Sequence, residues 1–258
     1  MTGLDADELD TGELRVVGRL TAASNATFVG TVGDVEVVYK PVAGERPLWD
    51  FPDGTLARRE VATYLVSEVL GGDVVPRTCL RDGPLGPGMV QLWQEPDPHQ
   101  DPVDVVATSR IPAQGWCTVL EGTDEHGRPV ALVHEDSAAL RRMAVLDVLV
   151  NNADRKGGHV LPVAGGHRYG VDHGVTFHTE PKLRTVLWGW VGRELDADER
   201  AGVQRVRAGV GAVLGERLAT LLDAPEVAAL AARCDRLLAS GRFPRPAGGS
   251  SPVPWPLF

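Results

Sequence analysis

The sequence has few of the features that mark exported or membrane-spanning proteins. It contains three cysteines, Cys79, Cys117 and Cys234, which are widely spaced and match no metal-ligand pattern. No uninterrupted apolar run approaches the roughly 18 residues that a membrane span requires. The acidic amino-terminal stretch also lacks the apolar centre of a signal peptide. These absences predict a cytoplasmic protein without stable membrane association.

Positive charge is also scarce, and lysine especially so. The chain has 26 lysine and arginine residues against 35 aspartate and glutamate residues, a net charge of −9, and no basic run. Because nucleic acids and anionic membranes are bound through clustered basic surfaces, this balance predicts neither as a partner. Only three of the basic residues are lysines, at Lys40, Lys156 and Lys182. Lysine provides a compact point charge where the arginine fork does not fit, so these positions are candidates for a functional site.

The chain is long and apolar enough, with 258 residues of which 43% are hydrophobic, to bury the core of one large domain or of two lobes. Near its beginning, residues 13–20 and 34–40 have the β-branched enrichment and partial alternation of strands. The segment 21–31 between them is rich in small and hydroxyl-bearing residues. We therefore predict a strand, a polar loop and a second strand that ends at Lys40.

A helix and a short strand are predicted next. Residues 55–70 have apolar side chains at helical spacing and stop before Gly71, a typical helix end. Residues 89–92 are apolar, and the proline-rich segment 94–102 that follows breaks regular structure. We place a lobe boundary there. The predicted division is a β-rich lobe over 1–95, a helical lobe over 96–240, and a Pro/Gly-rich tail over 241–258.

The second part begins with a predicted hairpin at 116–135, whose turn is Asp-Glu-His-Gly. Residues 137–151 are apolar on nearly every side and predict a buried helix. Two short strands over 159–163 and 167–177 are predicted to follow, and then two helices within 196–240 that separate near Pro225.

A charged triplet follows the buried helix directly, in the stretch NNADRKGGH. It places Asp154, Lys156 two residues later and His159 five residues later. Further on, the stretch VDHG contains Asp172 and, two residues later, Gly174. A charged triplet alone is more often a solvated turn, but its spacing from these other residues favours a site.

The order of these elements and motifs resembles the protein kinase-like fold. Asn152, Asp154 and Arg155 at the end of an apolar helix, followed by Asp172 and Gly174, are similar to the motifs of the phosphatidylinositol 3-/4-kinase-like family, particularly the type II phosphatidylinositol 4-kinases. The chain looks like a member of an actinobacterial family with weak similarity to those kinases. The resemblance covers roughly residues 15 to 200 and implies an α+β, two-lobed fold with a small β-rich lobe and a mainly helical lobe.

The resemblance implies an ATP site between the lobes. Lys40 is expected to contact the α- and β-phosphates and Glu60 to orient it, although Glu60 could equally belong to a solvated helix face. Ser24 and Asn25 are expected to close over the phosphates. The backbone of four residues is expected to contact adenine: Val90, Gln91, Leu92 and Trp93.

The resemblance also assigns the residues of phosphate transfer. Asp154 is expected to orient the acceptor hydroxyl, Lys156 to follow the γ-phosphate, and Asp172 to hold a divalent cation. His159 departs from the family pattern, which has Asn as the second metal ligand at this position. A hard cation such as Mg²⁺ prefers oxygen, so His159 indicates Mn²⁺ tolerance, a single metal, or no metal role.

The sequence therefore predicts an ATP-dependent phosphotransferase that uses Mg²⁺ or Mn²⁺. Two alternatives stay open: a nucleotide-binding pseudokinase that acts as a regulatory module, and an enzyme that transfers AMP on the same fold. The acceptor, a hydroxyl on a small molecule or a protein, cannot be read from the sequence, because one fold serves many acceptors. A membrane lipid is disfavoured by the absence of a basic face or a palmitoylation cluster. The oligomeric state is also open.

Overall fold

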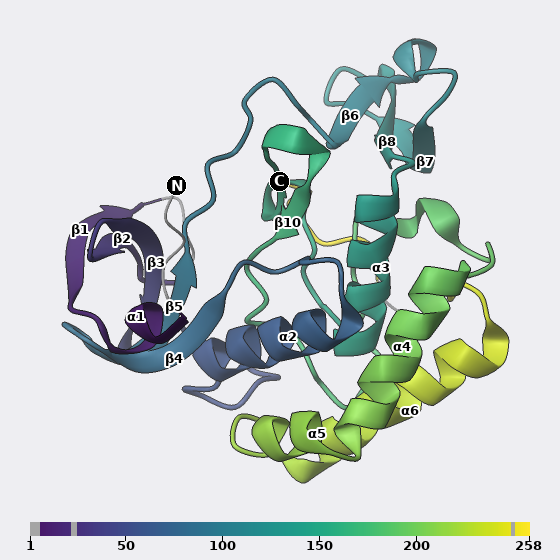
Figure 1. The fold of residues 1–258 in the computed structure, drawn as a ribbon. Helices are drawn as coiled ribbons and strands as arrows, with labels where there is room; N and C mark the ends of the chain where they lie inside the picture. Colours follow the sequence, from purple (N-terminus) through teal and green to yellow (C-terminus); the bar gives the residue numbers. More distant parts are fainter. Residues whose placement is uncertain (1–5, 22–24, 249–250) are drawn as a thin grey trace.

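The computed structural model describes residues 6–21, 25–248 and 251–258, and they form two parts (Figure 1). An antiparallel sheet near the amino terminus faces a larger part that holds most of the helices. The α+β fold class, with a β-rich first part and a mainly helical second part, is confirmed. The division into lobes at residue 95 stays a prediction.

The amino-terminal sheet has five strands in the order β1-β2-β3-β5-β4. Alternate side chains such as Val37, Tyr39 and Val90 form its small core. The segment 21–31, predicted as a loop between two strands, contains most of an additional strand, β2, which begins at Thr27. Gly30 lies within β2 where a Cβ atom would be 2.5 Å from the Arg15 carbonyl oxygen, so only glycine fits there. The strands are β1 (Leu14–Leu20), β2 (Thr27–Val32), β3 (Val35–Pro41), β4 (Thr78–Gly83) and β5 (Gly86–Leu92), and the short helix α1 (Ala6–Thr11) contacts β4.

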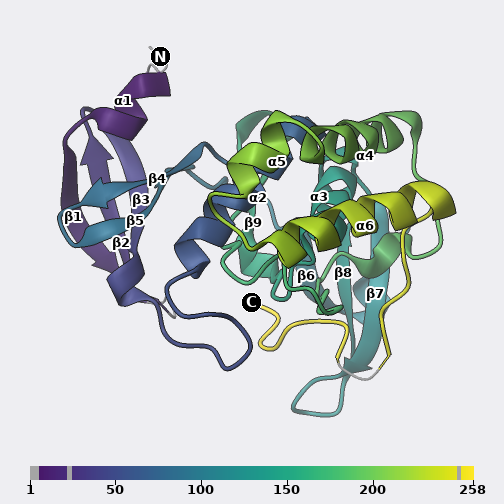
Figure 2. The ribbon, with the colours of Figure 1, turned by 90° about the horizontal axis from the view of Figure 1, so that it is seen from below.

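Helix α2 (Leu56–Leu70) connects the two parts, since it contacts β4 and β5 on one side and α3, α4 and α5 on the other (Figure 2). Two of its amino-terminal N–H groups are bound by Glu45, from the segment that precedes the helix. The Glu45 carboxylate accepts hydrogen bonds from the N–H groups of Leu56 and Ala57 at 3.0 and 2.8 Å. A carboxylate at this end of a helix also complements its dipole. The helix ends at Gly71, which has a φ of 83°.

A second sheet of three strands opens the helical part, with the order β6-β8-β7. The predicted hairpin is its β7–β8 pair. Helix α3 follows, and it starts with the Ser137 hydroxyl accepting from the Leu140 N–H and ends at Asn151 in the left-handed region. Eight of its residues are buried, and all of them except Asp147 belong to the main hydrophobic core. The elements are β6 (Val103–Ala107), β7 (Trp116–Thr123), β8 (Pro129–Glu135) and α3 (Ala138–Val150).

The carboxy-terminal region contains three helices where two were predicted. The break near Pro225 is observed, but a second break occurs at Gly211. Asp196 and Asp223 begin the first and the last helix, each in a capping box with a glutamate three residues later. None of the helices that the structure describes is long and apolar enough to cross a membrane. The helices are α4 (Ala197–Val210), α5 (Val213–Leu218) and α6 (Ala224–Ser240).

The tail after α6 runs back across the molecule and contacts the loop that follows α3. The Pro252 carbonyl oxygen accepts from the Thr185 N–H at 3.1 Å, and the Leu257 carbonyl oxygen accepts from the Gly157 N–H at 2.8 Å. The ring of Phe258 lies where a Cβ atom on Gly157 would be. The tail is irregular as predicted but is held in place. The remaining elements are β9 (Val160–Pro162), β10 (Arg168–Gly170) and the short 3-10 helices η1 (Val42–Gly44), η2 (Thr108–Arg110), η3 (Gly157–His159), η4 (Ala164–Gly166) and η5 (Trp188–Trp190).

Candidate active site

Three of the predicted site residues meet in the space between the sheet and the helical part. The Nζ atom of Lys40, on β3, is 2.6 Å from Glu60 Oε1 on α2 and 2.7 Å from Asp172 Oδ1 in the loop after β10. Glu60 is buried, whereas 48% of the Asp172 side chain is exposed. Lys40 therefore has a fixed partner on its inner side and an accessible partner on its outer side.

The charges of this cluster shift one another's proton affinity. Burial lowers the pKa of Lys40, but the adjacent carboxylates of Asp172 and Glu60 outweigh burial and raise it above its ordinary value. The Lys40 ammonium in turn holds the pKa of Asp172 well below the usual range of a carboxyl. Lys40 is therefore positively charged and Asp172 negatively charged at neutral pH.

Glu60 has a second role that its helix position alone does not reveal. While Oε1 binds Lys40, Oε2 accepts a hydrogen bond from the backbone N–H of His173 at 2.9 Å. This bond fixes the loop next to Asp172, whose φ of 60° is in the left-handed region that Asp and Asn tolerate better than other side chains. Glu60 thus positions both the lysine and the loop that holds the aspartate.

The loop after α3 brings in Asp154 and Lys156. The Asp154 N–H donates to the Asn152 side-chain oxygen at 3.0 Å, and its own carboxylate is 3.5 Å from Lys156 Nζ. Burial raises the pKa of Asp154, although Lys156 opposes the shift. A carboxylate with a raised pKa, one third of which is exposed, is suited to accept a proton or a hydrogen bond from a hydroxyl.

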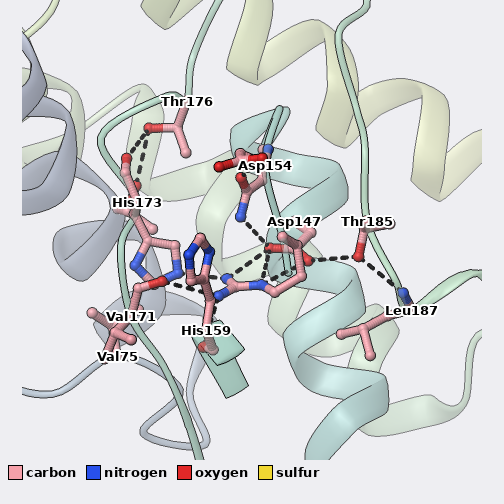
Figure 3. Close-up of polar contacts among 12 residues, drawn as sticks. Val75, Asp147, Asp154, His159, Val171, His173, Thr176, Thr185 and Leu187 are labelled. Carbon is pink, nitrogen blue, oxygen red and sulfur yellow. Dashed lines mark hydrogen bonds and ion pairs between the residues drawn. The ribbon is translucent and has the colours of Figure 1, made fainter. Parts of the chain in front are cut away.

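A buried ion pair below this loop was not among the predicted site residues. Arg155 and Asp147 are both fully buried, and the guanidinium Nη2 is 2.9 Å from Asp147 Oδ1 (Figure 3). Asp147 also accepts from the Asn152 amide at 2.9 Å and from the Thr185 hydroxyl at 3.1 Å. With these partners, the carboxylate has the additional hydrogen bonds that a buried ion pair requires. The available signal in the sequence was Asp147 itself, a charged residue within an otherwise apolar helix.

Arg155 connects the two loops that hold the candidate aspartates. Its Nη1 donates to the carbonyl oxygens of His159 and Val171 at 3.2 and 3.1 Å. Its Nη2 donates to His173 Nε2 at 2.6 Å. His173 must accept through that nitrogen, and burial together with the nearby Arg155 charge lowers its pKa well below the ordinary value. The Arg155 guanidinium thereby fixes the spacing of the two loops.

His159 lies against the candidate metal-binding aspartate. Its Nε2 is 3.3 Å from Asp172 Oδ2, and its buried Nδ1 has no hydrogen-bond partner in the described part of the chain. Burial lowers the pKa of His159 to about 4, so its ring is neutral at neutral pH and one nitrogen lone pair is free. Within the described residues, no three acidic, histidine or cysteine side chains gather as a complete metal site. Asp172 and His159 nonetheless fit a cation that takes its other ligands from phosphate and water.

Among known proteins, Protein Rv2133c of Mycobacterium tuberculosis is 50% identical to this chain over 260 residues, which span 96% of this chain and 93% of that protein. The chain belongs to the Rv2133c family. No protein-family model matches the sequence. The crystal structure of the Helicobacter pylori proinflammatory kinase CtkA is similar over 91% of this chain and 94% of that one, with a TM-score of 0.47 and 10% identity.

In this member of the Rv2133c family, the structure describes only some of the residues predicted to contact the nucleotide phosphates. Ser24 lies outside the described residues. The Asn25 side chain accepts from the Arg46 N–H at 2.9 Å, which ties the end of its loop to the segment after η1. The contact of these two residues with phosphate stays a prediction.

The predicted adenine contacts are on β5, which pairs with β3 on one side and β4 on the other. Val90 is buried in the sheet core, and Gln91 donates to the Thr78 hydroxyl at 2.8 Å. The N–H groups of Leu92 and Trp93 already donate to the Arg77 and Glu36 carbonyl oxygens. Backbone contact with adenine stays a prediction, and at Leu92 and Trp93 it would have to use the carbonyl oxygens.

Proposed function

We propose that the chain is an ATP-dependent phosphotransferase with a protein kinase-like fold. One observation supports this most directly: Lys40 binds Glu60 and Asp172 at 2.6 and 2.7 Å, from three elements far apart in the sequence. A partly buried cation held beside an accessible carboxylate is what a site for phosphate groups and their cation needs. Phosphate transfer requires positioning and charge neutralisation more than covalent chemistry by the protein.

In this proposal Lys40 binds the phosphates nearest the nucleoside, and Glu60 keeps the ammonium directed at them. The Asp172 carboxylate, together with His159, would hold Mg²⁺ or Mn²⁺, which supplies positive charge to the phosphate oxygens when bound. Both carboxylate ligation and neutral imidazole ligation are compatible with Mn²⁺.

Asp154 and Lys156 act on the acceptor side. Asp154 accepts a hydrogen bond from the acceptor hydroxyl and takes its proton as the hydroxyl oxygen bonds to the γ-phosphorus, while the bond from that phosphorus to the departing ADP oxygen breaks. Lys156, 3.5 Å from Asp154, neutralises the γ-phosphate as it is transferred. The acceptor is a hydroxyl on a small molecule or a protein rather than a membrane lipid or a nucleic acid. We place the reaction in the cytoplasm.

A regulatory pseudokinase is the second candidate, and His159 is the observation that favours it. In the kinase-like pattern an Asn oxygen at this position holds a second Mg²⁺ ion, whereas His159 offers a ring nitrogen. In a pseudokinase the two parts of the molecule would bind nucleotide without turning it over. The two candidates differ in turnover, not in nucleotide binding.

The test is calorimetric titration of ATP into the protein with Mg²⁺, with Mn²⁺ and with a chelator, for wild type and for Asp172→Asn. Asparagine tolerates the left-handed backbone of Asp172 and keeps its size, so the variant removes charge with little strain. We expect metal-dependent binding in wild type and a loss of about 100-fold or more in the variant. The matched control is Asp101→Asn, an exposed aspartate remote from the cluster.

Equal ATP affinity in wild type and Asp172→Asn would rule the proposal out. Turnover separates the candidates: mass spectrometry of an acceptor incubated with ATP and Mn²⁺ distinguishes an added phosphate from an added AMP. Binding without any ATP consumption would favour the pseudokinase.

A further inference from the structure

A cavity of about 830 Å³ lies in the helical part and is separate from the candidate active site. Its walls come from the end of α3, the segment 179–183, η5 and Gly192, the carboxy-terminal half of α6, and the chain that leaves α6. This volume is within the range of sites for small organic ligands, about 300–1,000 Å³. Neither the proposed transfer reaction nor the ATP contacts use it.

One wall of the cavity contains a buried arginine whose charge is not balanced. Only 8% of Arg233 is exposed. Its Nε donates to the Leu149 carbonyl oxygen at 2.6 Å and its Nη1 to the His178 carbonyl oxygen at 3.3 Å. Its buried Nη2 has no partner, and none of the carboxylates in the described residues pairs with it. Burial lowers the pKa of Arg233 to about 10, which shows how poorly the charge is solvated.

An uncompensated buried guanidinium is costly, and proteins keep one where an anion completes it. Three more arginines line the same cavity: Arg236, Arg242 and Arg245. Arg242 pairs with Glu194, whereas Arg236 and Arg245 have no carboxylate partner within the described part of the chain. The single acidic residue of the wall is Glu180. Such a concentration of positive charge is unusual in a chain with a net charge of −9.

Much of the rest of the wall is apolar and includes two aromatic rings. Trp188, Phe243, Leu183 and Leu237 line the cavity together with Val148. An inorganic anion would leave these side chains uncovered, and an uncharged apolar molecule would leave Arg233 without a partner. The two kinds of surface together require a ligand that carries both kinds of group.

We infer that this cavity binds an organic anion, with an apolar or aromatic body against Trp188 and a phosphate or carboxylate group at Arg233. In this proposal the Arg233 guanidinium, whose Nη2 is unpaired and closed off from solvent, turns that donor to the anion, and Arg236 and Arg245 contribute charge at the rim. The inference does not depend on the proposed transferase activity, because no residue of the Lys40 cluster lines the cavity.

The test is binding of 1-naphthyl phosphate and 1-naphthoate, followed by calorimetry and by tryptophan fluorescence, with 1-naphthol as the uncharged probe. We expect at least one of the two anions to bind with saturation and about tenfold or more tightly than 1-naphthol. The two anions show whether the head group is phosphate or carboxylate. Weak, non-saturating binding of both would overturn the inference.

Two variants locate the bound probe. Arg233→Met retains the length of the side chain and should abolish anion binding. Arg236→Gln/Arg245→Gln alters only exposed residues, folds regardless of the buried position, and should weaken binding about tenfold. Arg110→Gln, an exposed arginine outside the cavity, is the matched control and should bind as wild type does. Equal affinity in the double variant and the control would also overturn the inference.

A third variant separates this cavity from the candidate active site. Naphthyl phosphate that bound among the ATP residues would lose its affinity in Lys40→Met. We expect unchanged probe binding in that variant, even where ATP binding is lost. Loss of probe binding in Lys40→Met would assign the anion to the active site and reject the cavity.

Discussion

Arg155 and Lys40 are two cationic side chains near the candidate site, and they differ in how far their partners are exposed to solvent. Arg155 is fully buried, pairs with the fully buried Asp147, and donates to two backbone carbonyl oxygens and His173. Lys40 pairs with the buried Glu60 on one side and with the half-exposed Asp172 on the other. The first cation has its partners supplied by the protein. The second has a partner that solvent or a ligand can reach.

This difference separates a structural ion pair from a reactive one. Arginine keeps its charge and binds several acceptors in a fixed plane, which suits a permanent connection between two loops. Lysine is a movable point charge, which can change partners from Asp172 to phosphate. Under the proposed function, that property would account for a lysine at position 40 in a chain with only three lysines. We therefore expect the removal of Arg155 to lower mainly stability and the removal of Lys40 to lower mainly function.

Removal of the buried arginine should have the largest effect. Arg155→Met leaves the Asp147 charge buried without a counter-ion, and we expect a loss of about 3–5 kcal/mol in the free energy of unfolding. Urea denaturation followed by circular dichroism measures it. Arg155→Met/Asp147→Leu removes both charges and should regain part of the loss. A cost below about 1 kcal/mol for the single variant would contradict a structural role for this pair.

Removal of Lys40 should affect function more than stability. We expect Lys40→Met to lower ATP turnover or affinity by at least about 100-fold, because the phosphates lose their fixed cation. The buried Glu60 then lacks its cationic partner and keeps only the His173 N–H, so a second change, Glu60→Gln, should recover stability but not ATP binding. Denaturation and ATP titration of both variants provide the two measurements. If Lys40→Met lost more stability than Arg155→Met, the distinction between the pairs would fail.

The neutral histidine beside Asp172 predicts a pH dependence of stability. Burial lowers the pKa of His159 to about 4, whereas the unfolded chain protonates near the ordinary value of about 6.5. Between these values the unfolded state binds the extra proton, so stability falls as the pH falls from about 6.5 to 4, by on the order of 2–3 kcal/mol.

The variant His159→Asn tests this dependence. It should lose less stability than wild type between pH 7 and pH 4.5 in urea denaturation, because one titrating group has been removed. His173 and His134 also have lowered pKa values from burial and remain in both proteins. The same variant supplies an amide oxygen for Mg²⁺, and its preference for Mn²⁺ over Mg²⁺ in ATP titration should decrease. Identical pH profiles would show that His159 titrates normally.

The third lysine should give the smallest effect. Lys182 pairs with Asp50 at 2.9 Å and lies 5.0 Å from the centre of the exposed Trp49 ring, at the edge between the two parts. Pairs of this kind contribute about 0–1 kcal/mol. We expect Lys182→Gln to lower the free energy of unfolding by no more than that and to leave ATP affinity unchanged. A double-mutant cycle with Asp50→Asn measures the pair itself.

Local signals in the sequence were sufficient for several elements. Helix α3 was predicted with its Ser137 start, and α2 with its Gly71 end, because caps and apolar spacing act within a few residues. The strands β4 and β6 were not predicted, since their alternate residues are polar and their pairing depends on distant strands. The small and hydroxyl-bearing residues of 21–31 predict a loop, but β2 begins at Thr27, and its Gly30 is required by contact with Arg15 on the neighbouring strand.

The candidate site also combines features that the sequence predicts with features that depend on packing between distant segments. Motif spacing indicated Lys40, Glu60 and Asp172, and the structure brings them together. The bond from Glu60 to the His173 backbone and the pairing of Arg155 with Asp147 depend on how α2 and α3 pack against loops, which spacing does not encode. The role of each residue in ATP chemistry stays a prediction that the experiments above address.

The contact between the tail and the loop after α3 also has a consequence for synthesis. The Gly157 N–H is bound by Leu257, which leaves the ribosome 100 residues later, and the Thr185 N–H is bound by Pro252. The β-rich part and α2 precede them, and domains acquire structure largely in the order in which they emerge. The loop that carries Asp154 therefore reaches its final form only after Leu257 has been synthesised, long after the loop itself.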